Sequence, residues 1–90
     1  MEQKVFVFHS SGAQFSGGVF SSKDKAEAWI LKHKLSGMLT GYPLDNGAYD
    51  WAVESELFTP KKELHYSASF IGGFTSAHLE HYHYEDGINA

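Results

Sequence analysis

The chain of 90 residues contains no cysteine, so neither a disulfide framework nor a cysteine-ligated zinc ion can hold its fold together. A domain of this length buries only about 60 to 65% of the surface that its unfolded chain exposes, so its core is small. With 42% hydrophobic and 16% aromatic residues, the chain can still build a packed core. We therefore expect one compact domain over residues 1–90, without room for a large enclosed active site.

The charged residues argue against several functions. The seven basic residues are all lysines, and with eleven carboxylates they give a net charge of -4. Phosphate-backbone binding typically uses arginine on a basic face, so we expect no nucleic-acid partner. The first apolar run has four residues, shorter than a signal-peptide core of about 7 to 15, and later runs fall far short of the about 20 residues that span a bilayer. A cytoplasmic protein without a membrane role is expected.

The order of the expected elements favours an α+β fold with a small, mainly antiparallel sheet of three to four strands and two helices packed against it. β-branched and aromatic runs or alternating residues, bounded by turn residues, are typical of strands. The expected strands cover residues 5–8, 19–20, 38–42 and 79–85, and Asp86 and Gly87 should end the last of them. Ser67 could cap a short helical turn through Phe70 and Ile71.

A helix is expected over residues 22–34, with Ser21 or Ser22 as its N-cap and Gly37 closing it. Its apolar stripe contains Ala26, Trp29 and Ile30, which should pack on one face of the sheet. Residues 48–56 fit a helical stripe or a strand alternation. We favour a helix that covers an edge or the same face of the sheet, because Asp45 or Asn46 can cap it and Pro60 lies just beyond its end.

The C-terminal part of the chain contains a histidine cluster made of His78, His81 and His83. On a strand, His81 and His83 project to the same side, and one further ligand would give a zinc or nickel site. The alternative is that these histidines and the tyrosines between them pack half-buried on a sheet. We favour this second reading and expect no cofactor and no native metal.

The glycine- and serine-rich stretch of residues 10–18 could offer backbone N–H groups to an anion. It matches no phosphate-binding motif, so a loop that tucks Phe15 onto the core or exposes it as a contact is the preferred interpretation. Asp45 and Asp50 could form an acid/base pair, although Asp45 also suits a turn or cap. No nucleophile motif is present in the sequence.

Carboxylates are concentrated in the second half of the chain, where residues 45–90 hold two lysines and eight acids. Carboxylates beside aromatic residues are typical of surfaces that steer and anchor a basic protein partner. The expected partner-binding residues are Tyr42, Asp45, Tyr49, Asp50, Glu54 and Glu56.

The segments YPLDNGAYDWA and EHYHYEDG, with the helix start VFSSKDKAEAWI, resemble a family of small bacterial domains of uncharacterised function. The resemblance covers residues 5–87 and implies a compact α+β domain, but no catalytic or ligand-binding residue. By size and charge alone, the chain is also similar to immunity proteins that neutralise a toxin. We therefore expect a non-enzymatic protein-binding domain. The alternatives are a structural or regulatory domain with an unknown ligand, or a histidine-based metal protein.

Overall fold

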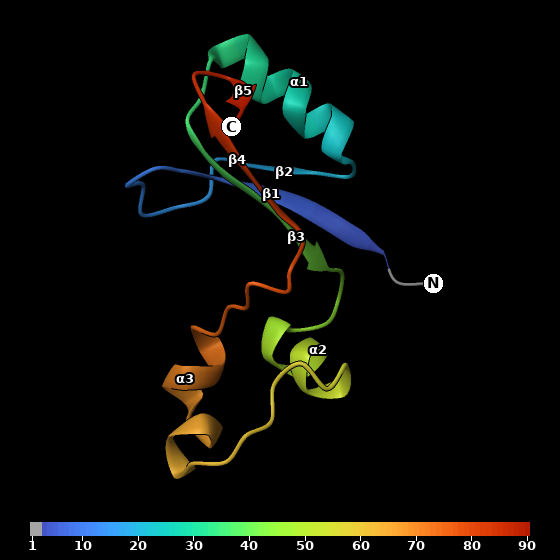
Figure 1. Cartoon of the computed structure of the whole chain (residues 1–90), viewed down its shortest axis with the longest axis vertical. Coiled ribbons are helices and arrows are strands. Elements are labelled where there is room, and N and C mark those ends of the chain that lie inside the picture. The colour runs from blue at the N-terminus through green and yellow to red at the C-terminus, as the bar shows by residue number, and fades with distance from the viewer. Residues whose placement is uncertain (1–2) are drawn as a thin grey trace.

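A computed structural model describes residues 3–90 and has an α+β architecture (Figure 1). The strands and helices follow one another as β1 (Lys4–Ser10), β2 (Gly18–Phe20), α1 (Lys23–His33), β3 (Gly37–Pro43), α2 (Ala48–Glu54), the 3-10 helix η1 (Glu63–Tyr66), α3 (Ala68–Gly72), β4 (His81–Glu85) and β5 (Ile88–Asn89). The expected fold class is confirmed. The sheet has five strands where three or four were expected, and there are three α-helices where two were expected.

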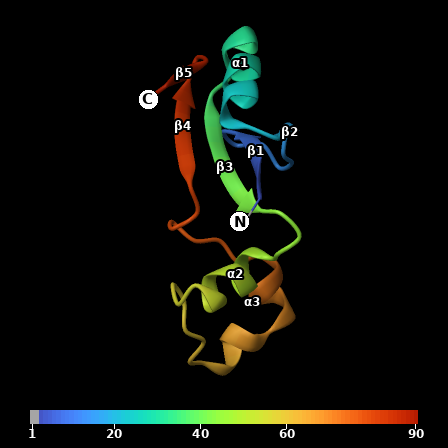
Figure 2. The same cartoon turned by 90° about the vertical axis from the view of Figure 1, so that its right-hand side faces the viewer.

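The five strands form one antiparallel sheet in the order β2-β1-β3-β4-β5. The longest pairing joins β1 to β3 at the centre, from Lys4 opposite Pro43 to Ser10 opposite Gly37. Helix α1 lies against one face of this sheet (Figure 2). A side chain at Gly37 would collide with the carbonyl oxygen of His9, so glycine permits the two chains to approach closely at this end.

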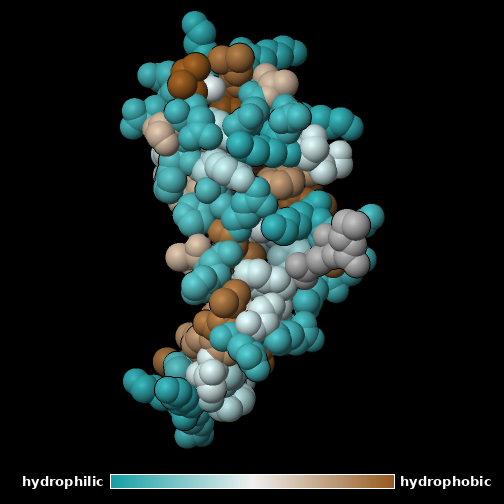
Figure 3. Space-filling view, turned by 45° about the vertical axis from the view of Figure 1, so that its right-hand side comes forward, coloured by the Kyte–Doolittle hydropathy of each residue, from teal (hydrophilic) through white to brown (hydrophobic). Residues whose placement is uncertain are grey.

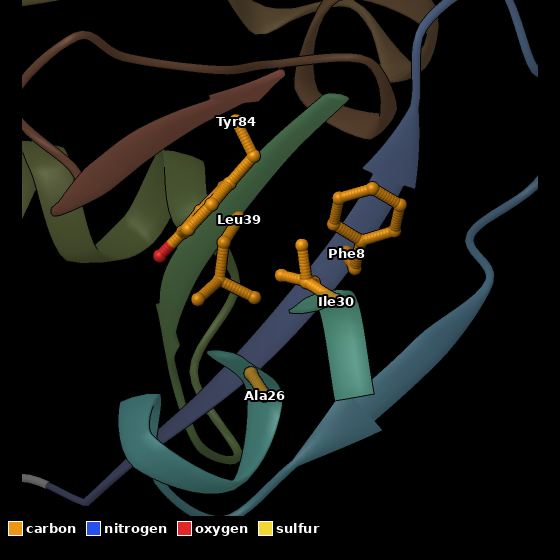
Figure 4. Packing of buried hydrophobic residues seen from close by; sticks show 5 residues of the cluster. All are labelled: Phe8, Ala26, Ile30, Leu39 and Tyr84. Atoms are coloured by element: carbon orange, nitrogen blue, oxygen red, sulfur yellow. The ribbon is translucent and has the colours of Figure 1, made fainter. Parts of the chain in front are cut away.

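The core fills the space between α1 and the sheet. Phe8 on β1, Leu39 on β3 and Tyr84 on β4 are buried against Ala26 and Ile30 of α1 (Figure 4). Successive side chains of a strand point to opposite faces of the sheet, so every second residue of β1, β3 and β4 points toward α1. The apolar stripe expected on the helix is thus confirmed, with two of its members buried completely.

The helix α1 begins and ends through local backbone capping. Ser22 is its N-cap and accepts a hydrogen bond from the backbone N–H of Lys25, as the sequence indicated. The C-cap is Lys34 in the left-handed conformation, with φ of 52°. The expectation that Gly37 closes this helix was wrong, because Gly37 is already the first residue of β3.

Residues 44–80 leave the sheet after β3 and form a separate helical lobe made of α2, η1 and α3 (Figures 1 and 2). The chain measures 44 × 31 × 20 Å, with a radius of gyration of 14.4 Å. A compact chain of this length would have a radius of gyration of about 12 Å. The lobe extends the molecule beyond one end of the sheet, so the expectation that α2 covers the sheet was wrong.

Aromatic rings hold the helical lobe together. The ring of Tyr49 lies 5.6 Å from Phe74 and 6.0 Å from Phe58, and Phe58 stacks on Phe70 at 5.8 Å. The imidazole of His65 packs on Phe70 at 5.0 Å, while its Nδ1 accepts a hydrogen bond from the backbone N–H of Lys61. Ser67 caps α3 by accepting a hydrogen bond from the N–H of Phe70, as expected from the sequence.

The C-terminal strand differs from the expected one at both ends. It begins at His81 instead of residue 79, and a further strand, β5, follows it. Asp86 and Gly87 form the two-residue turn between β4 and β5, with φ of 51° and 87°. An Asp-Gly pair with two positive φ values is the preferred chemistry of a tight hairpin turn. Reading this pair as the end of the last strand therefore missed β5.

Replacing Trp29 with alanine should lower the free energy of unfolding by about 3 kcal/mol, since large-to-small changes of aromatic core residues typically cost this much. The Trp29 ring packs edge-on against Phe8 at 5.8 Å and against Phe20 at 5.4 Å. Urea denaturation followed by circular dichroism measures the change. Leu31→Ala is the control, because Leu31 lies on the same helix and is 55% exposed. Equal stability losses in the two variants would contradict the role given to Trp29.

Candidate binding surface

The face of the sheet opposite α1 carries no helix, and we call it the open face. The pairing register places two rows of side chains across it: Val7, Thr40 and His81 in one row, and His9, Met38 and His83 in the next. The residues of this face on the three central strands are Val5, Val7, His9, Met38, Thr40, Tyr42, His81 and His83.

Residues 75–77, which connect the helical lobe to β4, help to shape two shallow clefts on the open face. One cleft of about 340 Å³ is lined by Val7, Met38, Tyr42 and Thr75 among others. A second cleft of about 240 Å³ lies between Met38, Thr40 and His81 on the sheet and residues 75–77. The face is thus a corrugated surface with depressions that a partner's side chains can enter.

The expected acidic surface is present around α2. Asp50 lies in the first turn of this helix, and Glu54 is its last residue. Asp45 lies in the preceding turn and Glu56 just after the helix, both with positive φ. All four carboxylates are exposed. Asn46 does not cap the helix but donates a hydrogen bond to Oε1 of Glu54 at 3.1 Å, and Gly47 is the N-cap.

The two tyrosines expected beside these acids lie elsewhere. Tyr49 is half-buried and packs on Phe58, Phe70 and Phe74, so it belongs to the interior of the helical lobe. Removal from water, followed by the charges of Tyr66 and Asp50, raises the pKa of Tyr49. Tyr42 is half-buried on the open face. The structure therefore exposes the four carboxylates around α2, while the two tyrosines are half-buried and contribute little to that surface.

The three histidines of the alternative metal site, His78, His81 and His83, do not converge. His81 and His83 project from the same side of β4, with ring centroids 5.7 Å apart. His78 lies in the exposed segment before β4, where its backbone N–H bonds to Oγ of Ser76. In residues 3–90, no three histidine or carboxylate side chains are placed so that they could hold a metal ion.

The loop between β1 and β2 uses several of its backbone N–H groups internally. Those of Ser11, Ala13 and Gly17 donate to the carbonyl oxygens of Ser36, Ser10 and Phe8. The side chain of Phe15 is 76% exposed, so the loop does not tuck it onto the core. The exposure of Phe15 agrees with the second interpretation of this loop, in which the ring is available as a contact.

A network of tyrosines and carboxylates lies on the α1 side of the sheet, and the sequence analysis did not predict it. The hydroxyl of the buried Tyr84 donates to Oε2 of Glu27 at 2.6 Å, joining β4 to α1. Tyr82 donates to Glu80, which also accepts from Lys4 at 3.1 Å. Tyr82 and Glu80 are 2 residues apart in the chain, but the other two pairs are separated by 57 and 76 residues. The alternation of tyrosines along residues 82–84 is therefore the one local signal that these two rings share a face.

This network shifts the pKa of its members in directions that keep each tyrosine neutral. Burial, and then the hydrogen bond to Glu27, raises the pKa of Tyr84. The hydrogen bond to Glu80 is the main cause that raises the pKa of Tyr82, and the same bond lowers the pKa of Glu80. A neutral tyrosine that donates to a carboxylate ties strand to helix, and it does not act as a base near neutral pH.

Comparisons with known proteins agree with a domain whose activity is not assigned. A family model described as a domain of unknown function, DUF7710, matches residues 5–90. The chain belongs to this family. No curated protein and no solved structure matches it. None of the helices in the described part of the chain has the length and apolar character needed to cross a membrane.

Above about pH 10, where unfolded tyrosines ionise, the free energy of unfolding should fall, because Tyr84 has a raised pKa in the folded state. The stabilisation is fully present below the pKa of the unfolded tyrosine and is lost as the pH rises toward the folded value. Tyr84→Phe should cost about 1 kcal/mol near neutral pH and make the alkaline decline shallower. Urea denaturation between about pH 8 and pH 11.5 tests this. An unchanged alkaline slope in the variant would contradict it.

Zinc should bind with a dissociation constant weaker than about 1 μM, which corresponds to roughly -8 kcal/mol. His81 and His83 supply two ligands, and a tight tetrahedral site generally requires at least three protein ligands. Calorimetric zinc titration of protein purified without an affinity tag, together with elemental analysis, measures this. A stoichiometric metal that survives dialysis would overturn the expectation.

Proposed function

We propose that the domain is a small cytoplasmic protein-binding module of bacterial origin, which presents the carboxylates around α2 to a basic partner protein. The observation that carries the proposal is that Asp45, Asp50, Glu54 and Glu56 are all exposed on a lobe that projects from the sheet. Such a position is accessible to a partner approaching from several directions.

None of the ion pairs found in residues 3–90 involves these four carboxylates. The two ion pairs found in residues 3–90 join Lys4 to Glu80 at 3.1 Å and Lys23 to Glu27 at 3.7 Å, and both lie on the α1 side of the sheet. Carboxylates without a neighbouring cation create a negative potential that attracts a basic surface and speeds its association.

Exposed apolar side chains lie on the same lobe and would supply contact area. Leu64 is 63% exposed and Tyr66 is 64% exposed, while Leu57 and Ile71 are exposed to a lesser degree. Apolar side chains reach the surface of this lobe above its hydrophilic tip (Figure 3). Interfaces generally combine buried apolar or aromatic anchors with a charged rim, and both components occur on the helical lobe.

A toxin-neutralising role is the specific form of this proposal. Its support is the small size and net charge of -4, which suit the inhibition of a basic toxin domain. The alternative is a structural or regulatory domain with a different ligand. A gene for a large secreted toxin directly next to the gene for this chain would favour the inhibitor, whereas a biosynthetic operon would count against it.

Charge reversal at Asp50 and Glu54 together should slow association with the partner about tenfold or more at low salt and leave folding intact, because electrostatic steering depends on the charge of the surface. The partner is first purified on immobilised wild-type domain from the cells that encode it, and association is then followed by stopped-flow fluorescence at several salt concentrations.

Asp24→Lys is the matched control for Asp50→Lys alone, because both change the net charge by the same amount at an exposed position in the first turn of a helix, and Asp24 lies outside the helical lobe. Circular dichroism establishes that each variant is folded. An association rate that is insensitive to salt and to the Asp50 and Glu54 changes would exclude steering through this surface.

A further inference from the structure

The open face of the sheet is almost free of charge, although the chain contains seven lysines and eleven carboxylates. Its central positions are occupied by valine, methionine, threonine, tyrosine and histidine. Lys4, at the start of β1, and Glu80, just before β4, pair with each other across β3 on the α1 side. The only carboxylate that the strand alternation places on this face is Glu85, at its corner beside the Asp86–Gly87 turn.

A sheet face that remains in water is ordinarily polar along alternate positions. Here Val7 lies between Val19 and Thr40 across the sheet, and Met38 lies between His9 and His83. Val19 is 65% exposed, and Met38 is 37% exposed. Apolar side chains from β1, β2 and β3 thus share a face that carries no carboxylate or lysine at its centre.

The lack of charge discriminates between kinds of partner. A strongly charged partner would lose the hydration of its charges on this face and would find no opposite charge there. A second uncharged sheet face has no such cost, and a two-fold axis presents each face with an identical one. We propose that the open face is the interface of a homodimer, in which it packs against the open face of a second copy of this chain.

The dimensions of the face permit such a dimer. The central strands β1 and β3 have seven residues each, so they are about 23 Å long. With neighbouring strands about 4.8 Å apart, the sheet presents roughly 400 Å² in projection. The accessible area of a corrugated surface is larger than its projection. The face is therefore comparable with the smallest specific interfaces, which bury about 600 Å² per partner, and we expect a weak dimer.

The position of α1 leaves this face free for packing. The helix covers the opposite face, so two copies can stack sheet on sheet with both helices on the outside. Aligned sheets of this kind pack about 10 Å apart, with their side chains interdigitated. The clefts beside Met38, Thr40 and residues 75–77 would receive the partner's side chains.

Three histidines make this interface sensitive to acid. His9, His81 and His83 carry no charge in the neutral form, and their protonation would place up to three positive charges per copy against three from the other copy. The other titratable groups near them are Tyr42 on the same face and Glu85 and Asp86 at its corner, where both carboxylates line a cleft with His9 and His83. These two carboxylates lie at one end of the open face, so they do not neutralise a positive charge on His81.

Sedimentation velocity at about pH 8, with protein from about 20 μM to about 1 mM, tests the dimer, because an interface of this size gives at most moderate affinity. We expect a rise toward twice the mass of one chain as the concentration increases. Met38→Lys places a charge at the centre of the face and should weaken dimerisation about tenfold or more. Leu31→Lys is the matched control, since it adds the same charge on the exposed side of α1 and should have no effect.

A monomer at every concentration at pH 8 would overturn the proposal, as would equal weakening by Met38→Lys and Leu31→Lys. Circular dichroism of both variants excludes unfolding as the cause. The double change at Asp50 and Glu54 should leave the dimer intact, because these residues lie around α2 and outside the open face. Dimerisation and binding of a basic partner can therefore fail independently of each other.

The histidine contribution is tested by repeating the measurement at about pH 5.5, where imidazoles are mostly protonated. The wild-type dimer should weaken about tenfold or more. The variant with His9→Gln, His81→Gln and His83→Gln should keep its dimer at both pH values. A wild-type dimer of equal strength at the two pH values would contradict the presence of these three histidines in the interface.

Discussion

The contact between α1 and the central strands is the interaction on which the rest of the fold depends. Ile30 and Ala26 are fully buried against Phe8 and Leu39, so the helix closes the core over the longest strand pairing. Within residues 3–90, α1 is the only helix that contributes residues to the buried core on the sheet. One helix covers one face, and the other face therefore stays open. The same arrangement that stabilises the domain thus leaves a sheet face with few charged residues exposed.

Local signals in the sequence predicted the elements that local interactions determine. Ser22 and Ser67 were expected as helix caps, and both accept the backbone hydrogen bonds that define a cap. The alternation along residues 81–85 separates the histidines from the tyrosines, and the structure places the two sets on opposite faces of β4. The Asp86–Gly87 turn is also a local signal. It was interpreted as the end of the last strand, so β5 was not predicted.

The arrangement of these elements could not be predicted in the same way. The helical stripe of α2 predicts an apolar side but not the apolar surface against which it packs. In the structure, Tyr49 of this stripe packs on the rings of Phe58, Phe70 and Phe74 in its own lobe. The acidic residues were found because four of them lie within twelve positions of one another, whereas the rows of the open face join residues from three strands. Distant pairings of this kind leave no short-range pattern in the chain.

The insertion of the helical lobe between β3 and β4 has a consequence for how the sheet forms. The hydrogen bond from the N–H of Gly41 to the carbonyl of Glu80 joins two strands whose facing ends are separated by the whole lobe. Closing so long a connection costs conformational entropy, and the cost grows with the length of the flexible segment. Contacts inside the lobe span few residues, as between Phe58 and Phe70 or Phe70 and Phe74. Ring contacts inside the lobe shorten the flexible part of this connection, so they lower the entropy cost of pairing β4 with β3.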